Sequence, residues 1–438
     1  MAEKEQRSPP SQYIREATGL VRTAGPWSGL AFNVIWTGNA VGLTAAFILQ
    51  SYMFVSPGLN FVELILIATL LSTLNAAVYM FFSLAIPRSG GDYQYISRSL
   101  HPSLGFMSGV NWALWLPLVL GWTGSKVVPI DFQSVFVSLG VVLHNTSLIT
   151  FANTLSTPNN SFVIGAIFIV AFTLITLLGN RVYFAFQTIA FAFMIVAFLI
   201  TVGVFATNSP VSFSNLIDKT FGAGTYNYMI DEFSKQGGYT LRPFFTAFLS
   251  GIVLWAGINT WSLGTSMIAG EIKQANKIKT WLISNVLGAI VVGVLFAITA
   301  QLYLSSVGEK FVYAATYLSG TQYYKIVFPP YYSSFVILAS PSVILSVIFA
   351  IGFFLGGIFY MPQNQIIASR MMLAFAFDRL APAKLGEVSE RFHVPVISTL
   401  IALLISLVSL WIYVYTNWLG FFSQLFTVAF SFSLRLLR

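Results

Sequence analysis

Cysteine and charge are the two things that this 438-residue sequence lacks. It contains no cysteine, which excludes disulfides, thiolate metal sites and cysteine nucleophiles. Only 8% of its residues are charged, against about 25% in an average soluble domain. Its histidines are scattered as His101, His144 and His393, and no carboxylate pair or nucleophile arrangement falls within an apolar segment. We therefore expect neither a soluble protein nor an enzyme.

Long apolar segments are what the sequence has in abundance. Hydrophobic residues make up 56% of the chain, including 41 Phe and 19 Tyr. A helix needs about 20 apolar residues to cross a bilayer. Ten stretches meet this requirement, at residues 28–50, 61–86, 103–125, 161–179, 183–206, 243–268, 281–305, 334–360, 395–416 and 420–437. The sequence predicts an all-α integral membrane protein with about ten transmembrane helices.

The basic residues predict the orientation of these helices. With the N-terminus in the cytoplasm, sixteen of the 22 Lys and Arg residues fall on cytoplasmic segments and six on outer ones. Topology and anionic lipid then account for the net charge of +8, so we expect no nucleic-acid partner. The apolar run 127–143 could form an eleventh span, but that would place the later basic clusters outside. We interpret it as a helix on the outer surface or a re-entrant segment.

The ten spans divide into two sets of five. A cytoplasmic tail (1–27) precedes a first repeat (28–206), and an extracellular connecting segment (207–242) precedes a second repeat (243–438). Because five is odd, the second repeat starts on the opposite side of the membrane, as an inverted repeat requires. Any ten-span protein divides in this way, so a further observation is needed.

That observation is an interruption in the first helix of each repeat. Residues 37–42 read TGNAVG and residues 255–261 read WAGINTW. Glycine lowers the cost of leaving helical geometry, and unwound backbone at membrane depth survives where it lines a cavity or binding site. Helix packing is the alternative, because small residues are common at membrane helix contacts. Interruptions at corresponding positions in both repeats favour a binding site.

Three segments carry a resemblance to a known family. Residues 87–98 read PRSGGDYQYISR, residues 270–273 read GEIK, and residues 369–382 read SRMMLAFAFDRLAP, followed by RFHVP at 391–395. In order and place they resemble the cytoplasmic-loop signatures of the amino acid, polyamine and organocation permease superfamily. The resemblance implies a five-plus-five inverted-repeat fold of the leucine-transporter type. It also implies a substrate held between helices one and six, with contacts from helices three and eight.

The resemblance places the substrate-binding residues at the two interruptions, although TGNAVG and the asparagine of WAGINTW depart from the family pattern. Weaker candidates lie in the third and eighth helices, at Trp112, Trp115, Tyr360 and Asn364. The predicted substrate-binding residues are Gly38, Asn39, Ala40, Val41, Gly42, Trp255, Gly257, Asn259 and Trp261.

The loop charges suggest a cytoplasmic gate of ion pairs. Its candidate members are Arg88, Asp92, Glu271, Arg370 and Asp378, with Glu271 or Asp378 opposite Arg88 or Arg370. Asp92 could also cap the helix that follows the glycine pair. A solvated cluster that only sets the topology is the alternative.

The coupling ion stays open. No Asp, Glu, Lys or Arg lies deep in a predicted span, since Glu63 is near an outer end and Lys126 is beyond one. Sodium could bind first-helix carbonyls and the hydroxyls of Ser342 or Ser346. Proton coupling through a group at a span end, exchange and uniport are further alternatives. We expect no cofactor.

We therefore expect a secondary active transporter of the plasma membrane that carries an amino acid or related amine by alternating access. A non-transporting sensor or scaffold on the same fold is the alternative. Family members commonly have twelve spans, so a truncated sequence and the oligomeric state are left open.

Overall fold

The structure is a computed structural model that describes residues 19–37, 61–126, 131–236, 243–246, 248–249 and 262–416. These residues are almost entirely helical, and their only β-type pairs are two isolated bridges, Ala24 with Ile272 and Ser89 with Ile268.

Seven helical runs of the described chain are long and apolar enough to cross a membrane. Four fall within residues 28–206, the predicted first repeat: α4 (Phe61–Ala85), α6 (Pro102–Lys126), α9 (Pro158–Leu177) and α10 (Asn180–Ala206). A fifth run joins α15 (Ile278–Trp281), the π-helical η3 (Leu282–Leu287) and α16 (Gly288–Val307). The other two are α19 (Val343–Ile358) with α20 (Tyr360–Phe377), and α21 (Val396–Tyr415).

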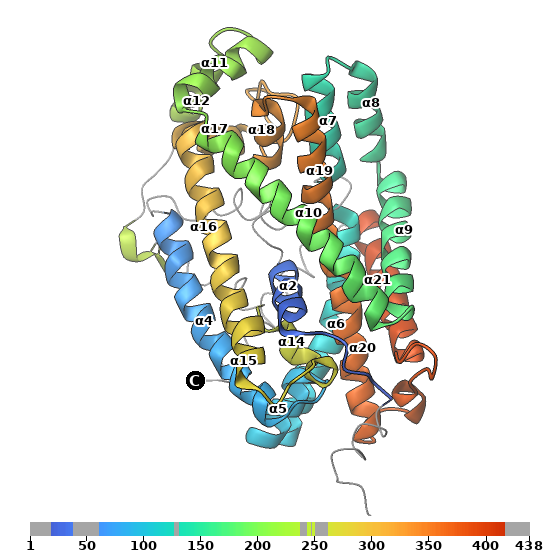
Figure 1. The fold of residues 1–438 in the computed structure, drawn as a ribbon. Coiled ribbons are helices and arrows are strands. Elements are labelled where there is room, and N and C mark those ends of the chain that lie inside the picture. Colours follow the sequence, from blue (N-terminus) through green and yellow to red (C-terminus); the bar gives the residue numbers. More distant parts are fainter. Residues whose placement is uncertain are drawn as a thin grey trace, which may run out of the picture.

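Shorter helices close the two ends of this bundle, as Figure 1 shows. The lower end carries α5 (Gly91–Ser99), α14 (Gly264–Met267) with η2 (Ala269–Glu271), and η4 (Ala383–Gly386). The upper end carries α7 (Gln133–Val142), α8 (Thr146–Leu155), α11 (Pro210–Phe221), α12 (Thr225–Lys235), α17 (Glu309–Leu318) and α18 (Tyr332–Ala339). The helix α2 (Pro26–Trp36) lies in the centre of the view.

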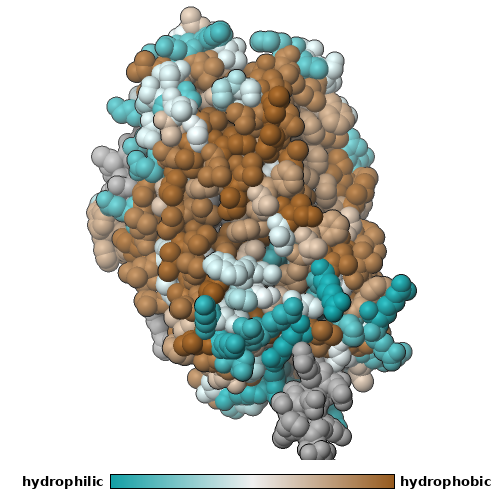
Figure 2. Space-filling model, in the orientation of Figure 1, coloured by the Kyte–Doolittle hydropathy of each residue, from teal (hydrophilic) through white to brown (hydrophobic). Residues whose placement is uncertain are grey.

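The surface matches this arrangement. A wide hydrophobic belt covers the middle of the visible face, and hydrophilic residues gather at its ends, most densely at the lower one (Figure 2). The long helices expose Leu, Ile, Val and Phe side chains, such as Leu70 on α4, Ile167 on α9 and Leu404 on α21. Lipid is the environment that such a belt requires, so the predicted membrane protein class is confirmed.

Most of the predicted spans are confirmed to within a few residues. The spans expected at 61–86, 103–125, 161–179, 183–206, 281–305 and 395–416 are all long helices. The expected spans 28–50 and 243–268 are described only in part, and 420–437 lies outside the described residues.

The span expected at 334–360 is wrong in its position. Residues 334–339 belong to the separate helix α18, and the spanning run extends from Val343 through Phe377. Its second half, α20, is buried along almost its whole length, including Gln363, Asn364 and Arg370. Residues 369–377 are therefore helical rather than a loop, and Arg370 belongs to this helix. Polar residues suggested a loop, but here they face the interior of the bundle.

The run 127–143 forms the helix α7 over residues 133–142. This helix is more than a surface element, because it packs against α8, α18 and α19, and buries Val135, Val137 and Leu139. The structure thus makes it part of the bundle, packed between α8, α18 and α19.

Small residues set the distance between the long helices. A Cβ atom added to Gly165 on α9 would lie 2.7 Å from the carbonyl oxygen of Gly124 on α6. Such close backbone approach is typical of membrane helix contacts, where apolar surface alone gives little attraction. Gly203 on α10 is different, since a Cβ there would meet nothing within 4 Å.

Candidate functional site

The helix α2 ends where the first interruption is predicted to begin. Its last residue is Trp36, and Thr37 is the C-cap. The Thr37 hydroxyl donates to the carbonyl of Asn33 at 2.8 Å and lies 3.3 Å from the hydroxyl of Ser262. Thr37 and Ser262 are 225 positions apart. The segments that flank the two predicted interruptions therefore meet.

The predicted substrate-binding residues themselves lie outside the described residues. This holds for Gly38 to Gly42 in the first interruption and for Trp255, Gly257, Asn259 and Trp261 in the second. Their role stays a prediction, and the geometry below concerns the walls around them.

Aromatic and amide side chains form the wall next to Thr37. The Trp36 indole donates to Asn364 Oδ1 at 2.6 Å, and its ring lies 6.0 Å from that of Trp112. Trp112 in turn meets Trp115 edge to face at 5.8 Å. The Nδ2 atom of Asn364 is buried without a hydrogen-bond partner among the described residues. Trp112, Trp115 and Asn364, weaker candidates in the sequence, are thus close together, and Trp36 is a member that the sequence did not suggest.

Tyr360, the remaining weaker candidate, begins α20. Its hydroxyl is hydrogen-bonded to that of Thr123 on α6. The third and eighth spans are therefore tied together by polar groups.

An amide network joins α2 to α14 and to η3. The Asn33 amide donates to the carbonyl of Ser284 at 2.6 Å and to the Thr265 hydroxyl at 3.0 Å, and it accepts the Thr265 backbone N–H at 2.9 Å. Asn285 completes the network by donating to Ser266 at 2.7 Å. The π-helical turn η3 supplies the Ser284 carbonyl, and such turns are common at functional sites.

Below this network lies a fully buried ion pair. The Arg370 guanidinium donates to both carboxylate oxygens of Glu271, through Nε at 2.8 Å and through Nη2 at 2.9 Å. Glu271 is 0% exposed and Arg370 1%. Asn180 donates to the same carboxylate and accepts from Arg370 at 3.2 Å, and Ser89 adds a longer contact to Glu271 at 3.3 Å. We call Ser89, Asn180, Glu271 and Arg370 the lower closure.

The N-terminal segment covers the lower closure. The backbone N–H of Thr23 donates to the carbonyl of Glu271 at 2.9 Å, and that of Lys273 donates to the carbonyl of Ala24 at 2.7 Å. Ala24 and Ile272 form a parallel bridge and are both buried. Four segments that are remote in the sequence therefore converge on Glu271: Ser89, Asn180 and Arg370 bond its carboxylate, and Thr23 bonds its backbone carbonyl.

The other predicted gate residues make different contacts. Asp92 accepts from Tyr79 at 2.5 Å and from the Trp112 indole at 2.7 Å, while Asp378 accepts from Tyr93 at 2.5 Å. Asp92 is not the cap of α5, because Gly90 occupies that position. Burial raises the pKa of the Asp92 carboxyl, and its hydrogen bonds from Tyr79, Trp112 and Ser108 oppose that rise. Arg88 is exposed and forms no ion pair with the residues that the structure describes.

The hydroxyls proposed for sodium have local partners. Ser342 caps α19 by accepting the backbone N–H of Leu345 at 3.3 Å, and Ser346 donates to the carbonyls of Ile337 and Ser342. The described part of the chain contains no group of three or more acidic or histidine residues that could hold a metal ion.

Sequence reasoning missed the buried amides of this region. Asn33 and Asn285 each stand inside a predicted apolar span, and a polar side chain in such a place usually faces a partner helix or a cavity. That signal could have marked both residues, whereas Asn180 lies between two predicted spans and carried no such signal.

Three comparisons place this geometry among known proteins. The amino acid permease family model matches residues 32–434. No curated protein matches the chain significantly. The fold is similar to that in the crystal structure of MhsT in complex with L-phenylalanine, with a TM-score of 0.51 and 12% identity over 87% of this chain and 79% of that chain. That likeness confirms the fold of the leucine-transporter type. The family match covers nearly the whole sequence, and the chain therefore belongs to the amino acid permease family of secondary transporters.

Proposed function

We propose that this amino acid permease carries an amino acid or a related amine across the plasma membrane by alternating access, with its N-terminus in the cytoplasm. The substrate binds between the interruptions at 37–42 and 255–261. The observation that carries this proposal is the contact of Thr37 with Ser262, beside the Trp36, Trp112 and Asn364 wall. Free backbone groups at such interruptions suit the carboxylate and the ammonium of an amino acid.

The lower closure is the cytoplasmic gate in this proposal. Its residues come from the loop after α4, the start of α10, the segment after α14, and α20. Opening this end of the bundle separates those segments, so Glu271 and Arg370 must part during the cycle. A pair that is broken and remade suits a gate, because its bidentate geometry specifies one closed arrangement.

The orientation has separate support. Lys219, Lys235 and Lys310 lie on the upper helices α11, α12 and α17, whereas Arg98, Lys277 and Lys279 lie near α5 and α15 at the lower end. These members of the two predicted groups lie at opposite ends of the bundle, which supports the proposed orientation under the positive-inside rule.

Uptake into proteoliposomes tests the proposal. We would measure accumulation and counterflow for a panel of radiolabelled amino acids and amines, with and without sodium and proton gradients. The variant Gly38→Leu should abolish saturable uptake, because a branched side chain would fill the proposed site. Gly203→Leu is the matched control and should transport normally, since Gly203 faces open space. Unaltered uptake in Gly38→Leu would refute the site. Saturable binding without flux in the wild type would instead favour the sensor.

A further inference from the structure

Asp131 is a buried acid that the transport site does not explain. It lies just before α7, between the third span and the outer helices, and its side chain is 0% exposed. Neither of its carboxylate oxygens has a hydrogen-bond partner among the residues that the structure describes. Buried ionised groups are almost always paired, so an unpaired carboxyl calls for an explanation.

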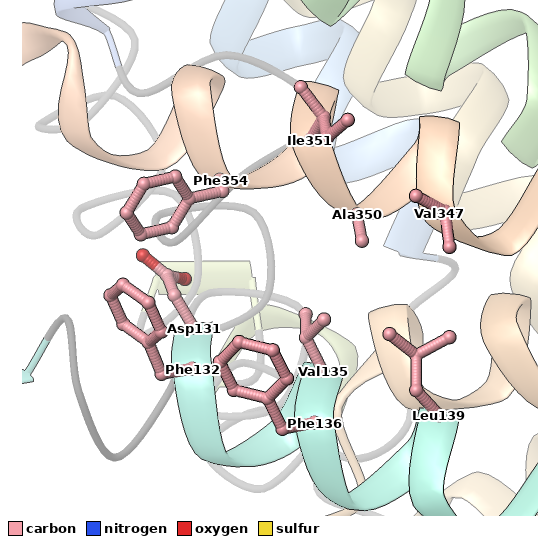
Figure 3. Close-up of a pocket in the computed structure, with 9 residues that line it drawn as sticks. All are labelled: Asp131, Phe132, Val135, Phe136, Leu139, Val347, Ala350, Ile351 and Phe354. Carbon is pink, nitrogen blue, oxygen red and sulfur yellow. The ribbon is translucent and has the colours of Figure 1, made fainter. Parts of the chain in front are cut away.

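Its surroundings cannot solvate a negative charge. Asp131 borders a cavity of about 230 Å³ between α7 and α19. Figure 3 shows its carboxyl beside the rings of Phe132 and Phe354. The other residues that line the cavity are also apolar: Val135, Phe136, Leu139, Val347, Ala350 and Ile351. An acid in such a site favours its neutral, protonated form.

Only phenols among the described titratable groups lie within electrostatic range of Asp131. They are Tyr331, just before α18, and Tyr360 on α20. Burial, with a smaller effect of the Asp131 charge, raises the pKa of Tyr331 to about 12, so this phenol stays neutral. No described basic side chain neutralises the acid. The carbon-lined cavity also lacks the several oxygen ligands that a hard metal cation needs. A proton is therefore the cation that fits.

We propose that Asp131 is the proton-binding group that couples substrate transport to a proton gradient. This inference rests on the transport function proposed above. Asp131 lies beside the middle of α9 and of the α19 run, since the ring of the next residue, Phe132, is 5.9 Å from that of Phe168 and 4.7 Å from that of Phe354. The helix that follows it, α7, packs on α18 and α19. Movement of α7 together with α18 and α19 exposes the carboxylate to external water, from which it takes one proton. The neutral acid is then buried, as in the present structure.

The same proton is released when the bundle opens on the other side. Tyr360 stands on the helix that continues from α19 towards the lower closure, and its hydroxyl bonds Thr123. Tyr360 is within electrostatic range of Asp131 but is not hydrogen-bonded to it, so water that enters when the bundle opens below takes the proton directly from the carboxyl. In each cycle one proton and one substrate molecule cross in the same direction, and no electron is transferred.

Proteoliposomes with an acidic exterior test this coupling, with an internal pH dye as a second readout. One coupled proton supports accumulation of up to about tenfold per pH unit. The wild type should approach this ratio and acidify the lumen. Asp131→Asn, which mimics the neutral acid, should lose gradient-driven accumulation and proton flux while it keeps counterflow. Asp231→Asn is the matched control, since Asp231 is exposed on α12, and it should behave as the wild type.

Several outcomes would overturn the coupling role. One is accumulation by Asp131→Asn that still follows the pH gradient, and another is wild-type counterflow with no response to that gradient. Loss of coupling in Lys126→Gln as well would show instead that Asp131 acts as half of an ion pair. A wild type without any counterflow would defeat the transport function itself, which is a separate result.

A further measurement keeps the proposal testable if Asp131→Asn does not fold. Asp131→Glu moves the carboxyl by one methylene, so its uptake should depend on pH with a shifted midpoint. An unchanged pH profile would count against the proposal. In folded variants, the infrared carbonyl band of a protonated buried acid should be present in the wild type and weaker in Asp131→Asn.

Discussion

Single residues with charge inside the bundle carry most of the specific chemistry of this protein. Glu271 and Arg370 are as buried as the apolar core, yet each is satisfied by the other and by Asn180. A pair of this kind adds little net stability compared with apolar residues, but removing one partner strands the other. The value of the pair therefore lies in defining the closed state.

We expect Arg370→Met to destabilise the protein by about 3–5 kcal/mol, because the Glu271 carboxylate would remain buried without a counterion. The double variant Glu271→Met/Arg370→Met should recover much of that loss. Unfolding in detergent, followed by tryptophan fluorescence, measures both. The control is Lys235→Met, which breaks the exposed pair with Glu232 and should change stability little. Equal losses in the single and double variants would contradict a buried pair.

At the scale of the element, close helix contacts depend on glycine. We expect Gly165→Leu to cost about 1–3 kcal/mol or more, because the side chain would push α9 away from the Gly124 backbone on α6. Gly203→Leu is the control and should change stability little, since no neighbour lies within 4 Å of its added Cβ. Thermal unfolding in detergent compares the two variants. A Gly165→Leu protein as stable as the control would show that α6 and α9 do not pack as described.

The sequence predicts correctly those helices whose surfaces contact lipid. Segments such as 61–86 and 183–206 are apolar on every side because they contact lipid and other helices. The eighth span was misplaced because α20 faces protein, where Gln363, Asn364 and Arg370 find partners on other helices. Hydropathy alone cannot distinguish a polar residue that lies in water from one that is paired inside a bundle.

The site was predictable only where local sequence determines it. The end of α2 at Trp36 follows from the polar, glycine-containing run behind it. The pairing of Glu271 with Arg370 was one of several combinations that the sequence left open, because it depends on contacts across 99 positions. Asp131 was overlooked because one acid at the edge of an apolar run resembles the end of a span.

At the scale of the whole molecule, the two ends of the bundle face different solutions. Because the sequence lacks cysteine, single cysteines can report the side of each end without any background substitution. We expect Asp231→Cys on α12 to react with a membrane-impermeant maleimide in intact cells. Glu390→Cys, exposed between η4 and α21, should react only after permeabilisation.

Permeabilised cells are the control for both variants, since each cysteine should then be labelled. The reverse pattern in intact cells would place the N-terminus outside and would turn the lower closure into an extracellular gate. Labelling of both positions in intact cells would contradict their location at opposite ends of the bundle.

The lower closure also determines when this protein can finish folding during its synthesis. Glu271 leaves the ribosome 99 residues before Arg370, which corresponds to roughly 5–20 s at typical elongation rates. Throughout that interval the carboxylate has no arginine to bind, so it must stay hydrated at the membrane surface while later spans are inserted. A nascent chain halted before the eighth span therefore exposes an unpaired glutamate, which quality-control factors of the membrane could recognise.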